Sequence, residues 1–290
     1  MADLKSLFDA HTPQTDYLTS MCRHYYCSFL SVAELISAPE HTVESFTHAH
    51  DAYEFLIPLT PLPLIAFEGS VYFGQPGFVY PVSPGAEHGP RIECADIANC
   101  NITADREAVE SRMRLKGLAD ARFDAKFESS RELQDYIRLL CREFMKGAAA
   151  DKSDLNALGA LIISALIELG CRPAASRPVP EKDYQRGMRR VVDYMSRNYC
   201  DDISLDFLAE MCGLTKSHFI TSFKKMYGEP PYSHILRLRI AKAKILLRNT
   251  DLPVADVAEE CGFKKQSAFT NMFKTAAGTT PTQYRTDRDV

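Results

Sequence analysis

Two stretches near the carboxyl end of the chain decide the fold: SLDFLAEMCGLTKSHFITSFKKMYGEPP at 204–231 and PVADVAEECGFKKQSAFTNMFKTAAGTTP at 253–281. They carry the same landmark residues in the same order, namely Leu205, Ala209, Gly213, Phe219, Phe223-Lys224, Gly228 and Pro231 in the first stretch, and Val254, Ala258, Gly262, Phe269, Phe273-Lys274, Gly278 and Pro281 in the second. The offset between the copies is 49 residues up to the glycine of the turn and 50 residues after it, so the second turn holds one extra residue. A repeat of this period predicts two similar helical units in tandem, which are typical of proteins that bind a long, grooved partner.

Each copy predicts a helix-turn-helix. In the first copy Ser204 is placed to cap a helix, and Gly213 follows that helix where a left-handed turn is needed. Thr215 is then placed to cap the next helix, and the small side chain of Ala209 lets the two helices approach closely. The second copy repeats these features, with Pro253 near the start of its first helix.

A long helix is predicted between the two copies. We expect the first unit at about 204–227, the linker helix at about 232–247 and the second unit at about 254–276. A helix of about 16 residues is roughly 24 Å long, so the linker can hold the second helix of each unit about one turn of DNA apart, near 34 Å, on one face of the duplex.

The second helix of each unit carries polar and basic side chains between its apolar positions. We expect the apolar positions to form the core and the exposed positions to meet DNA, with the lysines on phosphates or merely in solvent. The expected contacts are Lys216, Ser217, Ile220, Thr221, Lys224 and Lys225 in the first unit, Lys264, Lys265, Gln266, Ser267, Thr270, Asn271 and Lys274 in the second, and Arg239 in the linker helix. The candidates for reading base edges are Lys216, Ser217, Gln266 and Asn271.

The segment from about Ile203 to Arg285 resembles the AraC/XylS family of bacterial transcription regulators. The residues that match include Leu205, Ala209, Gly213, Phe219, Phe223-Lys224, Gly228, Arg239, Ala243, Leu246-Leu247, Val257-Ala258, Gly262-Phe263, Ser267, Phe269, Phe273-Lys274, Gly278, Pro281 and Tyr284-Arg285. The resemblance implies sequence-specific binding to double-stranded DNA through two helix-turn-helix units joined by one long helix, with RNA polymerase as a further partner.

The chain departs from this family at two exposed positions where Arg is frequent. Thr221 and Asn271 stand there, each two residues after the first phenylalanine of its helix. Losing two cations should reduce the salt-dependent affinity for phosphates. Asn271 is suited to read adenine rather than guanine if it faces base edges, whereas Ile220 offers only an apolar contact, such as one to a thymine methyl group.

The amino-terminal half has a different sequence pattern. Residues 24–102 are rich in Tyr, Phe, Val and Ile and are interrupted by Pro or Gly every several residues, which predicts short strands in a β-sandwich or small barrel. From Ser129 the apolar period becomes helical, and we expect helices at about 129–146 and 154–170, the first opened by a capping box of Ser129 and Glu132. The predicted fold class is α+β with two domains: a small β-barrel followed by two helices, and then an all-α domain.

Three prolines within residues 172–183 cannot sit inside a helix, so this segment is expected to be an exposed and fairly stiff connector. We therefore expect a sensor and dimerisation domain at 1–171, a Pro-rich linker at 172–183 and a DNA-binding domain at 184–290.

The net charge of −4 hides an asymmetry. Residues 184–290 carry 17 Lys and Arg against 12 Asp and Glu, whereas residues 1–183 carry 17 against 26. An acidic part joined to a basic part favours a control domain fused to a nucleic-acid binder. The nine cysteines are expected to be reduced and mostly buried.

A cytoplasmic location without a membrane partner is expected from the apolar pattern. The amino terminus has no basic region followed by an apolar core, as an export signal would. The most apolar stretch, Leu155–Leu169, is too short for a membrane span and contains Glu168.

A second motif lies in the β-rich zone. His48, His50 and Glu54 are followed 34 residues later by His88. Alternation along a strand would point the first two histidines to the same side, as a shared metal ion requires. The pattern resembles the paired motifs of the cupin superfamily, in which such residues converge on a divalent metal inside a barrel. The resemblance implies a cupin-like sensor barrel, in which these four residues bind a metal ion or, together with Tyr80, form a small-molecule site.

We therefore expect an effector-controlled transcription regulator rather than an enzyme, with no cofactor unless the barrel holds a divalent metal. The helices at about 129–146 and 154–170 would form a homodimer, and the effector would bias it between two arrangements of its DNA-binding domains. Two alternatives stay open. One is a metal-dependent cupin enzyme, such as a dioxygenase or isomerase, that carries a DNA-binding tail. The other is an effector-independent activator whose barrel only dimerises.

Overall fold

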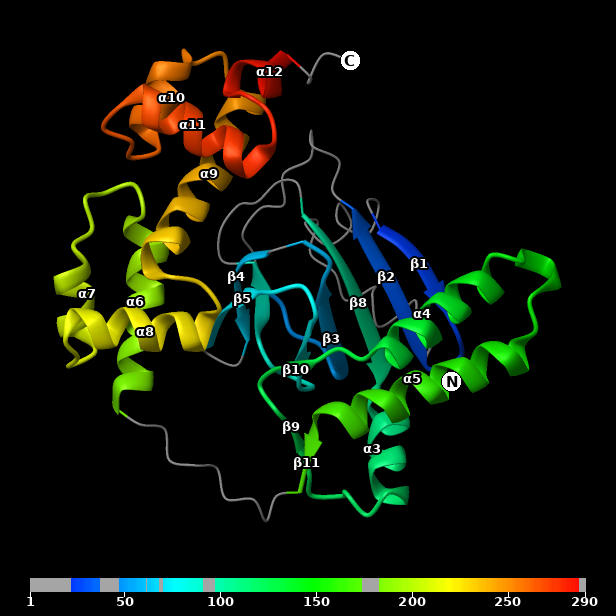
Figure 1. The fold of residues 1–290 in the computed structure, drawn as a ribbon. Coiled ribbons are helices and arrows are strands. Elements are labelled where there is room, and N and C mark those ends of the chain that lie inside the picture. The colour runs from blue at the N-terminus through cyan, green and yellow to red at the C-terminus, as the bar shows by residue number, and fades with distance from the viewer. Residues whose placement is uncertain are drawn as a thin grey trace.

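The computed structural model describes residues 22–36, 47–60, 62–67, 70–90, 97–173 and 183–286. Within them an amino-terminal part of strands and helices is followed by a part made of helices alone, and the two parts lie against each other (Figure 1). The fold is therefore α+β, as predicted. Residues 1–21, which were assigned to the first domain, and residues 174–182, which make up most of the Pro-rich linker, lie outside the described residues.

Within the described residues, the strands form two larger antiparallel sheets and one short pair, β9 with β11. The strands are β1 (Cys22–Tyr26), β2 (Leu30–Ile36), β3 (Ala52–Pro58), β4 (Leu62–Phe67), β5 (Ser70–Gly74), β6 (Phe78–Val82), β7 (His88–Pro90), β8 (Ala98–Asp105), β9 (Arg122–Phe123), β10 (Phe127–Glu128) and β11 (Cys171–Arg172). The first sheet has the order β1-β2-β8-β3-β6-β10 and the second the order β5-β4-β7. Neither sheet closes on itself in this part of the chain, so the predicted barrel is not confirmed.

The six-stranded sheet is the middle layer of the amino-terminal part. Along β3 the side chains alternate, so that Phe55 and Ile57 join one core cluster while Leu56 joins another. The first cluster contains the buried face of the helices, and the second contains Tyr80 of β6 and Leu62 of β4. Burial on both faces explains why β3 is apolar along most of its length.

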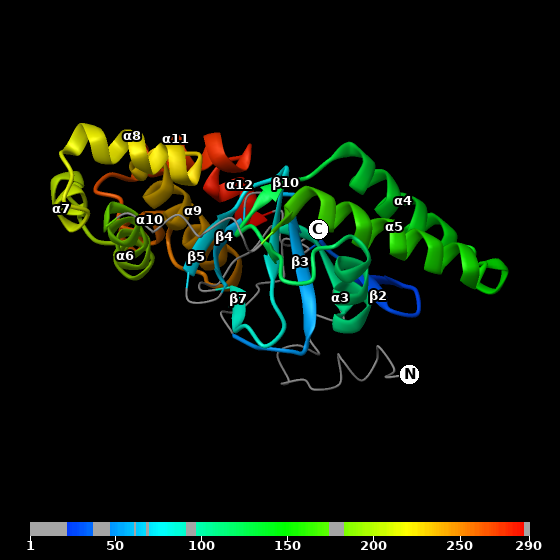
Figure 2. The ribbon, with the colours of Figure 1, turned by 90° about the horizontal axis from the view of Figure 1, so that it is seen from below.

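Three helices pack against the sheet face that carries Phe55 and Ile57. They are α3 (Arg106–Leu115), α4 (Arg131–Phe144) and α5 (Lys152–Gly170), and a short 3-10 helix, η1 (Gly147–Ala149), precedes α5. Figures 1 and 2 show α4 and α5 lying side by side. The cap of α4 corrects the sequence-based expectation by one residue. Ser130, not Ser129, accepts the hydrogen bond from the Leu133 N–H, at 3.0 Å. Ser129 instead donates its backbone N–H to the carbonyl oxygen of Gly77 beside the sheet, at 2.8 Å, which keeps it outside the helix.

Helix α5 is the one described helix that is long and apolar enough to cross a membrane, by length and composition alone. Its buried residues include Ile162, Leu166 and Ile167, which belong to the same core as β3 and α4. The helix is apolar over more than one face because one side packs on the sheet and another on α4.

The carboxyl-terminal part consists of helices α6 (Asp183–Asn198), α7 (Leu205–Met211), α8 (Lys216–Tyr227), α9 (Pro231–Asn249), α10 (Val254–Glu260), α11 (Gln266–Ala277) and α12 (Pro281–Thr286). We call α7 and α8 the first unit, and α10 and α11 the second unit. Each unit has its own core. Leu238 of α9 packs in the first core with Phe219 and Phe223, and Leu247 packs in the second with Phe269. Helix α9 thus contributes residues to both cores, its first part to the core of the first unit and its last part to the core of the second.

Candidate nucleic-acid interface and sensor site

Helix α8 presents the first set of predicted DNA contacts. Thr215 caps it by accepting a hydrogen bond from the His218 N–H, at 3.4 Å, as predicted. Phe219 and Phe223 are fully buried, so the positions between them turn outward. The exposed predicted contacts on this helix are Lys216, Ser217, Thr221, Lys224 and Lys225. Ile220 is only half-buried and packs against the first core, so part of its surface is taken up inside the protein.

Helix α11 presents the second set. Its N-cap is Lys265, whose side chain makes no capping hydrogen bond, in contrast to Thr215 of α8. Phe269 and Phe273 are fully buried. The exposed predicted contacts are Lys264, Lys265, Gln266, Ser267, Asn271 and Lys274, and Thr270 is half-buried.

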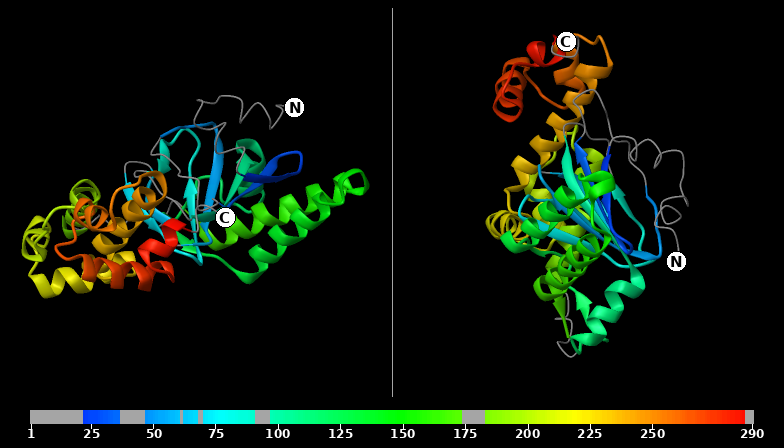
Figure 3. Two further views of the ribbon diagram at one scale, coloured as in Figure 1. Left: turned by 90° about the horizontal axis from the view of Figure 1, so that it is seen from above. Right: turned by 90° about the vertical axis from the view of Figure 1, so that its right-hand side faces the viewer.

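The two helices that carry these sets lie on the same side of the helical part. Seen from below and from above, α8 and α11 both lie along one edge of it (Figures 2 and 3). Two of the lysines have ion-pair partners at this surface: Lys216 with Asp206 at 2.9 Å, and Lys264 with Asp202 at 2.7 Å. Both pairs are exposed, and exposed pairs contribute little to stability, so these lysines can exchange their partners for phosphates at low cost.

Arg239 plays a different part from the other predicted contacts. Its three guanidinium nitrogens donate to the carbonyl oxygens of Tyr199, Asp201 and Gly262, at 2.6, 2.8 and 2.6 Å. The first two carbonyls follow α6 and precede the first unit, and the third lies in the turn of the second unit. At Gly262, φ is +79°, and an added Cβ would lie 2.1 Å from the Cys200 carbonyl oxygen, so backbone meets backbone at this junction. Arg239 therefore ties the two units together.

The histidine motif of the amino-terminal part converges as predicted. The ligand atoms of His48, His50, Glu54 and His88 all lie within 4.8 Å of one another. Glu54 Oε2 lies 3.0 Å from His50 Nε2 and 3.1 Å from His88 Nε2. Glu54 belongs to β3 of the six-stranded sheet, whereas His88 belongs to β7 of the three-stranded sheet and pairs with His48 in a backbone bridge. The cluster thus spans the two sheets.

The electrostatics of this cluster follow from its burial and its pairing. Burial by itself would raise the pKa of Glu54, but the two imidazoles, His88 foremost, hold it well below its usual range. Burial works to lower the pKa of His88, but the ion pair with Glu54 raises it above its usual value. His88 Nδ1 lies 2.9 Å from the Ala86 carbonyl oxygen, which can only accept, so Nδ1 is a donor and Nε2 is the atom aimed at the cluster.

These residues fit a divalent metal by their chemistry. Three imidazoles and a carboxylate are a donor set that suits zinc, iron or manganese. The Nδ1 atom of His88 is held by a carbonyl group, as the second nitrogen of a metal-binding histidine usually is. Nδ1 of His50 is buried and has no hydrogen-bond partner among the described residues.

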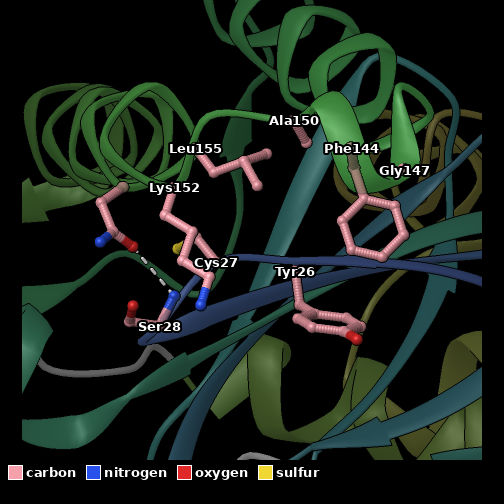
Figure 4. Close-up of a pocket in the computed structure, with 9 residues that line it drawn as sticks. Tyr26, Cys27, Ser28, Phe144, Gly147, Ala150, Lys152 and Leu155 are labelled. Atoms are coloured by element: carbon pink, nitrogen blue, oxygen red, sulfur yellow. Dashed lines mark hydrogen bonds between the residues drawn. The ribbon is translucent and has the colours of Figure 1, made fainter.

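The fifth predicted ligand-binding residue, Tyr80, is not one of the four residues whose ligand atoms cluster. It is fully buried in the core between the two sheets, and its hydroxyl accepts a hydrogen bond from the Gln75 backbone N–H at 3.0 Å. A surface pocket of about 470 Å³ lies elsewhere, between the β1–β2 turn and the α4–α5 connection (Figure 4). Its lining includes Tyr26, Phe144 and Lys152 and none of the five predicted ligand-binding residues.

Comparison with known proteins identifies the helical part. A family model described as a helix-turn-helix domain matches residues 208–287. The probable transcriptional regulator LumQ of Photobacterium leiognathi is 25% identical over 259 residues, which are 86% of this chain and 98% of LumQ. The virulence regulon transcriptional activator VirF of Yersinia enterocolitica is 34% identical over 127 residues, which are 44% of this chain and 42% of VirF. A solved transcriptional regulator with an AraC-type DNA-binding domain, from Chromobacterium violaceum, is 26% identical, covers 36% of this chain and 93% of that one, and has a TM-score of 0.33.

Two helix-turn-helix units on one linker helix, each with exposed basic and polar residues on its second helix, define a tandem helix-turn-helix DNA-binding protein. The matched model and the relatives LumQ and VirF define it more narrowly. Residues 208–287 form a helix-turn-helix domain of the AraC/XylS type, and the chain is a DNA-binding transcription regulator. The chain spans nearly all of LumQ but about two fifths of VirF, so the properties of VirF as a whole do not carry over.

Proposed function

We propose that this AraC-type regulator places α8 and α11 in successive major grooves of one double-stranded DNA site, under the control of an effector bound by its amino-terminal part. The observation that carries the DNA interface is that α8 and α11 lie along one edge of the helical part (Figure 2) and that each exposes polar and basic residues. Lysines at both ends of each helix suit phosphates, and the side chains in the first turns suit base edges.

Within this interface the two kinds of contact have different residues. Lys216, Lys224, Lys225, Lys264, Lys265 and Lys274 are proposed to bind phosphates, and Lys216 is placed in this group because it already pairs with the carboxylate of Asp206. The proposed contacts to bases are Ser217, Thr221, Gln266, Ser267, Thr270 and Asn271, with a smaller apolar contact from Ile220. We leave Arg239 out of the interface, because a phosphate contact would require it to give up hydrogen bonds that join the two units.

Selection of bound duplexes from a random pool tests this proposal. The full chain should enrich a site with two conserved segments about one helical turn apart. A chain that enriches no sequence, or a single short segment, would contradict two-unit reading. A Gln266→Ala chain run in parallel should change the preference in one segment only.

The domain organisation that we propose follows the contacts. Residues 1–171 would form the sensor, residues 172–183 the linker and residues 184–290 the DNA-binding domain. A cupin-like sensor is supported by the two facing antiparallel sheets and by the histidine cluster that spans them. No enzymatic reaction is proposed, and we expect the protein to act in the cytoplasm.

The histidine cluster is the effector site that we propose. His48, His50, Glu54 and His88 would hold a divalent metal, either alone or as the anchor for a small molecule with oxygen donors. The bound cation would supply positive charge between the two sheets. His88 would then hold its Nε2 toward the cation while Nδ1 stays on the Ala86 carbonyl, and Glu54 would neutralise the charge.

Elemental analysis of the purified full chain tests the cluster. Close to one equivalent of zinc, iron or manganese is expected, and it should be lost in His50→Ala but kept in His218→Ala, which alters an exposed histidine on α8. Added metal should also raise the Tm of the wild-type chain and not that of His50→Ala. Metal at equal content in both variants, or none in the wild type and no Tm shift, would refute the site.

A homodimer through α4 and α5 completes the proposal. Leu139 and Leu161 are 44% and 41% exposed and line one groove of about 490 Å³ between these helices, next to Leu158. A second copy that covers this groove would place two DNA-binding domains in one assembly able to recruit RNA polymerase. Sedimentation should show a dimer for the wild type and a monomer for Leu161→Glu. A wild-type monomer at micromolar concentration would refute it.

A further inference from the structure

The amino-terminal part and the first unit meet through a specific polar contact. Gln75 lies in the turn between β5 and β6, and its side-chain amide donates to the Tyr227 carbonyl oxygen at 2.7 Å. Tyr227 is the last residue of α8. Its carbonyl is one of the four that a helix cannot satisfy internally, and an N–H donor there also meets the negative end of the helix dipole. Gln75 therefore completes the end of the proposed DNA-reading helix.

Gln75 is itself held from the sensor side. Its backbone N–H donates to the Tyr80 hydroxyl at 3.0 Å, and its side-chain oxygen accepts from Lys126 at 3.4 Å. Tyr80 is fully buried in the core between the two sheets. A shift in that core moves the Tyr80 hydroxyl, and through it the turn that carries Gln75.

A second contact runs parallel to the first. Arg237 of α9 donates to the Leu62 carbonyl oxygen, at the start of β4, at 3.2 Å. The same guanidinium donates to Glu229 at 2.6 Å, and Glu229 follows directly on the glycine that ends α8. The sensor thus touches the carboxyl end of α8 and the nearby stretch of α9 together.

These contacts leave the proposed DNA-binding face open. Lys216, Ser217 and Lys224 stay exposed on α8 while Gln75 holds the far end of the helix. The contact therefore orients the first unit with respect to the sensor and does not mask it.

We propose that Gln75 is the relay between the sensor and the first unit, joining the core around Tyr80 to the end of α8. The proposal rests on the proposed function, because it names the path by which the sensor would act on DNA reading. By thermodynamic linkage, coupling between two sites acts equally in both directions. If the state of the sensor changes the affinity of the first unit for DNA, then DNA bound to that unit must change the stability of the sensor turn.

Two equivalent glycines make it possible to test the Gln75 contact separately from the backbone strain that any substitution causes at a helix end. Gly228 and Gly278 end α8 and α11 in the same left-handed conformation, with φ of +82° and +77°. A Cβ at Gly228 would lie 1.8 Å from Gln75 Nε2, whereas at Gly278 it would meet no atom of the described residues within 4 Å. Alanine costs similar backbone strain at both positions, but only at Gly228 does it displace the Gln75 side chain.

Amide hydrogen exchange of the full chain without DNA is the first test. The segments to follow are 74–80 and 223–229. Both should exchange roughly 3- to 10-fold faster in Gly228→Ala than in Gly278→Ala, the range expected for losing one hydrogen bond. Gln75→Ala should have the same effect without the glycine strain, against Gln134→Ala on the exposed surface of α4 as its control. Equal exchange in the two glycine variants would overturn the proposal.

The second test adds a duplex enriched by the wild-type chain. Bound DNA should change exchange in 74–80 in the wild type and in Gly278→Ala, and this change should vanish in Gly228→Ala and Gln75→Ala. A change that survives in both of those variants would overturn the relay even if the contact exists. If the wild type enriches no duplex, the proposed function fails and the relay fails with it, whereas the DNA-free comparison still decides whether the contact forms.

Discussion

The two helix-turn-helix units build the same aromatic contact from different residues. Phe223 of the first unit packs edge to face on His234, with ring centroids 5.3 Å apart, and Phe273 of the second packs on Tyr284 at 5.2 Å. Both contacts lie at equivalent positions of the repeat, 50 residues apart. Phe223 thus packs on a buried imidazole of α9, which titrates near neutral pH in its ordinary state, whereas Phe273 packs on a tyrosine of α12, which does not.

The surroundings of the two units differ in the same direction. The carboxyl end of α8 is held by Gln75, whereas no described residue lies within 4 Å of the Cβ position at Gly278, which ends α11. The first turn of α8 is capped by the Thr215 side chain, whereas the equivalent Lys265 side chain makes no capping hydrogen bond to α11. The comparison suggests a division of roles, in which the first unit is tied to the sensor and the second offers more polar side chains to DNA.

Removing Arg239 is expected to have the largest effect on stability, because its hydrogen bonds join the two units. Arg239→Ala leaves three carbonyl groups without their charged donor and should lower the free energy of unfolding by about 3 kcal/mol. Chemical denaturation measures this loss. Arg239→Lys keeps the charge without the planar fork and should recover only part of it.

The same variants test whether Arg239 acts by positioning. Arg239→Ala should broaden the spacing that the chain accepts between the two segments of its site, because the units are no longer tied. A variant with wild-type stability, or one whose only defect is a flatter salt dependence, would return Arg239 to the set of phosphate contacts.

Acid should affect the first unit more than the second, through His234. Burial lowers the pKa of His234 to about 4, against its ordinary 6.5, although Glu229 opposes this. The unfolded state therefore takes up the proton first. The resulting loss of stability begins as the pH falls below 6.5, and it is complete below about 4, at roughly 3 kcal/mol at most.

Denaturation of the full chain between pH 7 and pH 4.5 measures this effect. His234→Phe keeps the ring contact with Phe223 and removes the titration, so its stability should fall less with acid than that of the wild type. Parallel curves for the two chains would show that His234 carries none of the acid sensitivity, and the contrast with Tyr284 would then be one of packing alone.

The sequence predicted the features that depend on local pattern. Ser204 and Thr215 cap their helices as expected, because capping is settled within three residues of chain. Helix α9 lies where apolar spacing placed it, although Pro231 starts it one residue earlier and Asn249 ends it two residues later than expected. The four residues of the histidine motif also converge, but not through the expected alternation along one strand. His48 and His50 precede β3, and Glu54 and His88 come from different sheets.

Features that depend on distant backbone could not be predicted in this way. Arg239 matches the family pattern and is basic, so it was assigned to DNA, but its partners are carbonyl groups that any residue supplies. Gln75 carries no signal at all beyond preceding a Pro-Gly turn. Closure of the predicted barrel likewise depends on how strands far apart in the chain pair, and alternation does not specify that pairing.

Base reading should be stronger in the second unit, and Gln266 tests this. Gln266 is equivalent to Lys216, which is paired with Asp206 on the first unit. Gln266→Ala should lower discrimination at one base pair by about 1–3 kcal/mol, whereas Lys216→Ala should mainly weaken binding to all sequences. Competition binding with single-base variants of the selected site measures both. A loss of discrimination in Lys216→Ala as large as in Gln266→Ala would remove the difference between the units.

The smallest expected effect concerns the phosphate contacts, and here the two units should agree. Lys224 and Lys274 occupy equivalent positions in the last turns of α8 and α11, and both are exposed. Replacing either with alanine should leave the sequence preference unchanged. The slope of the logarithm of the observed DNA-binding constant against the logarithm of the salt concentration should become shallower by about 1. Titration of the selected duplex at four or more salt concentrations measures the slope. If Lys274→Ala flattens it and Lys224→Ala does not, the end of α8 lies away from the phosphates in the bound state. The Gln75 contact at that same end would then hold the first unit away from the backbone, and the unequal slopes would become equal once Gly228→Ala releases it.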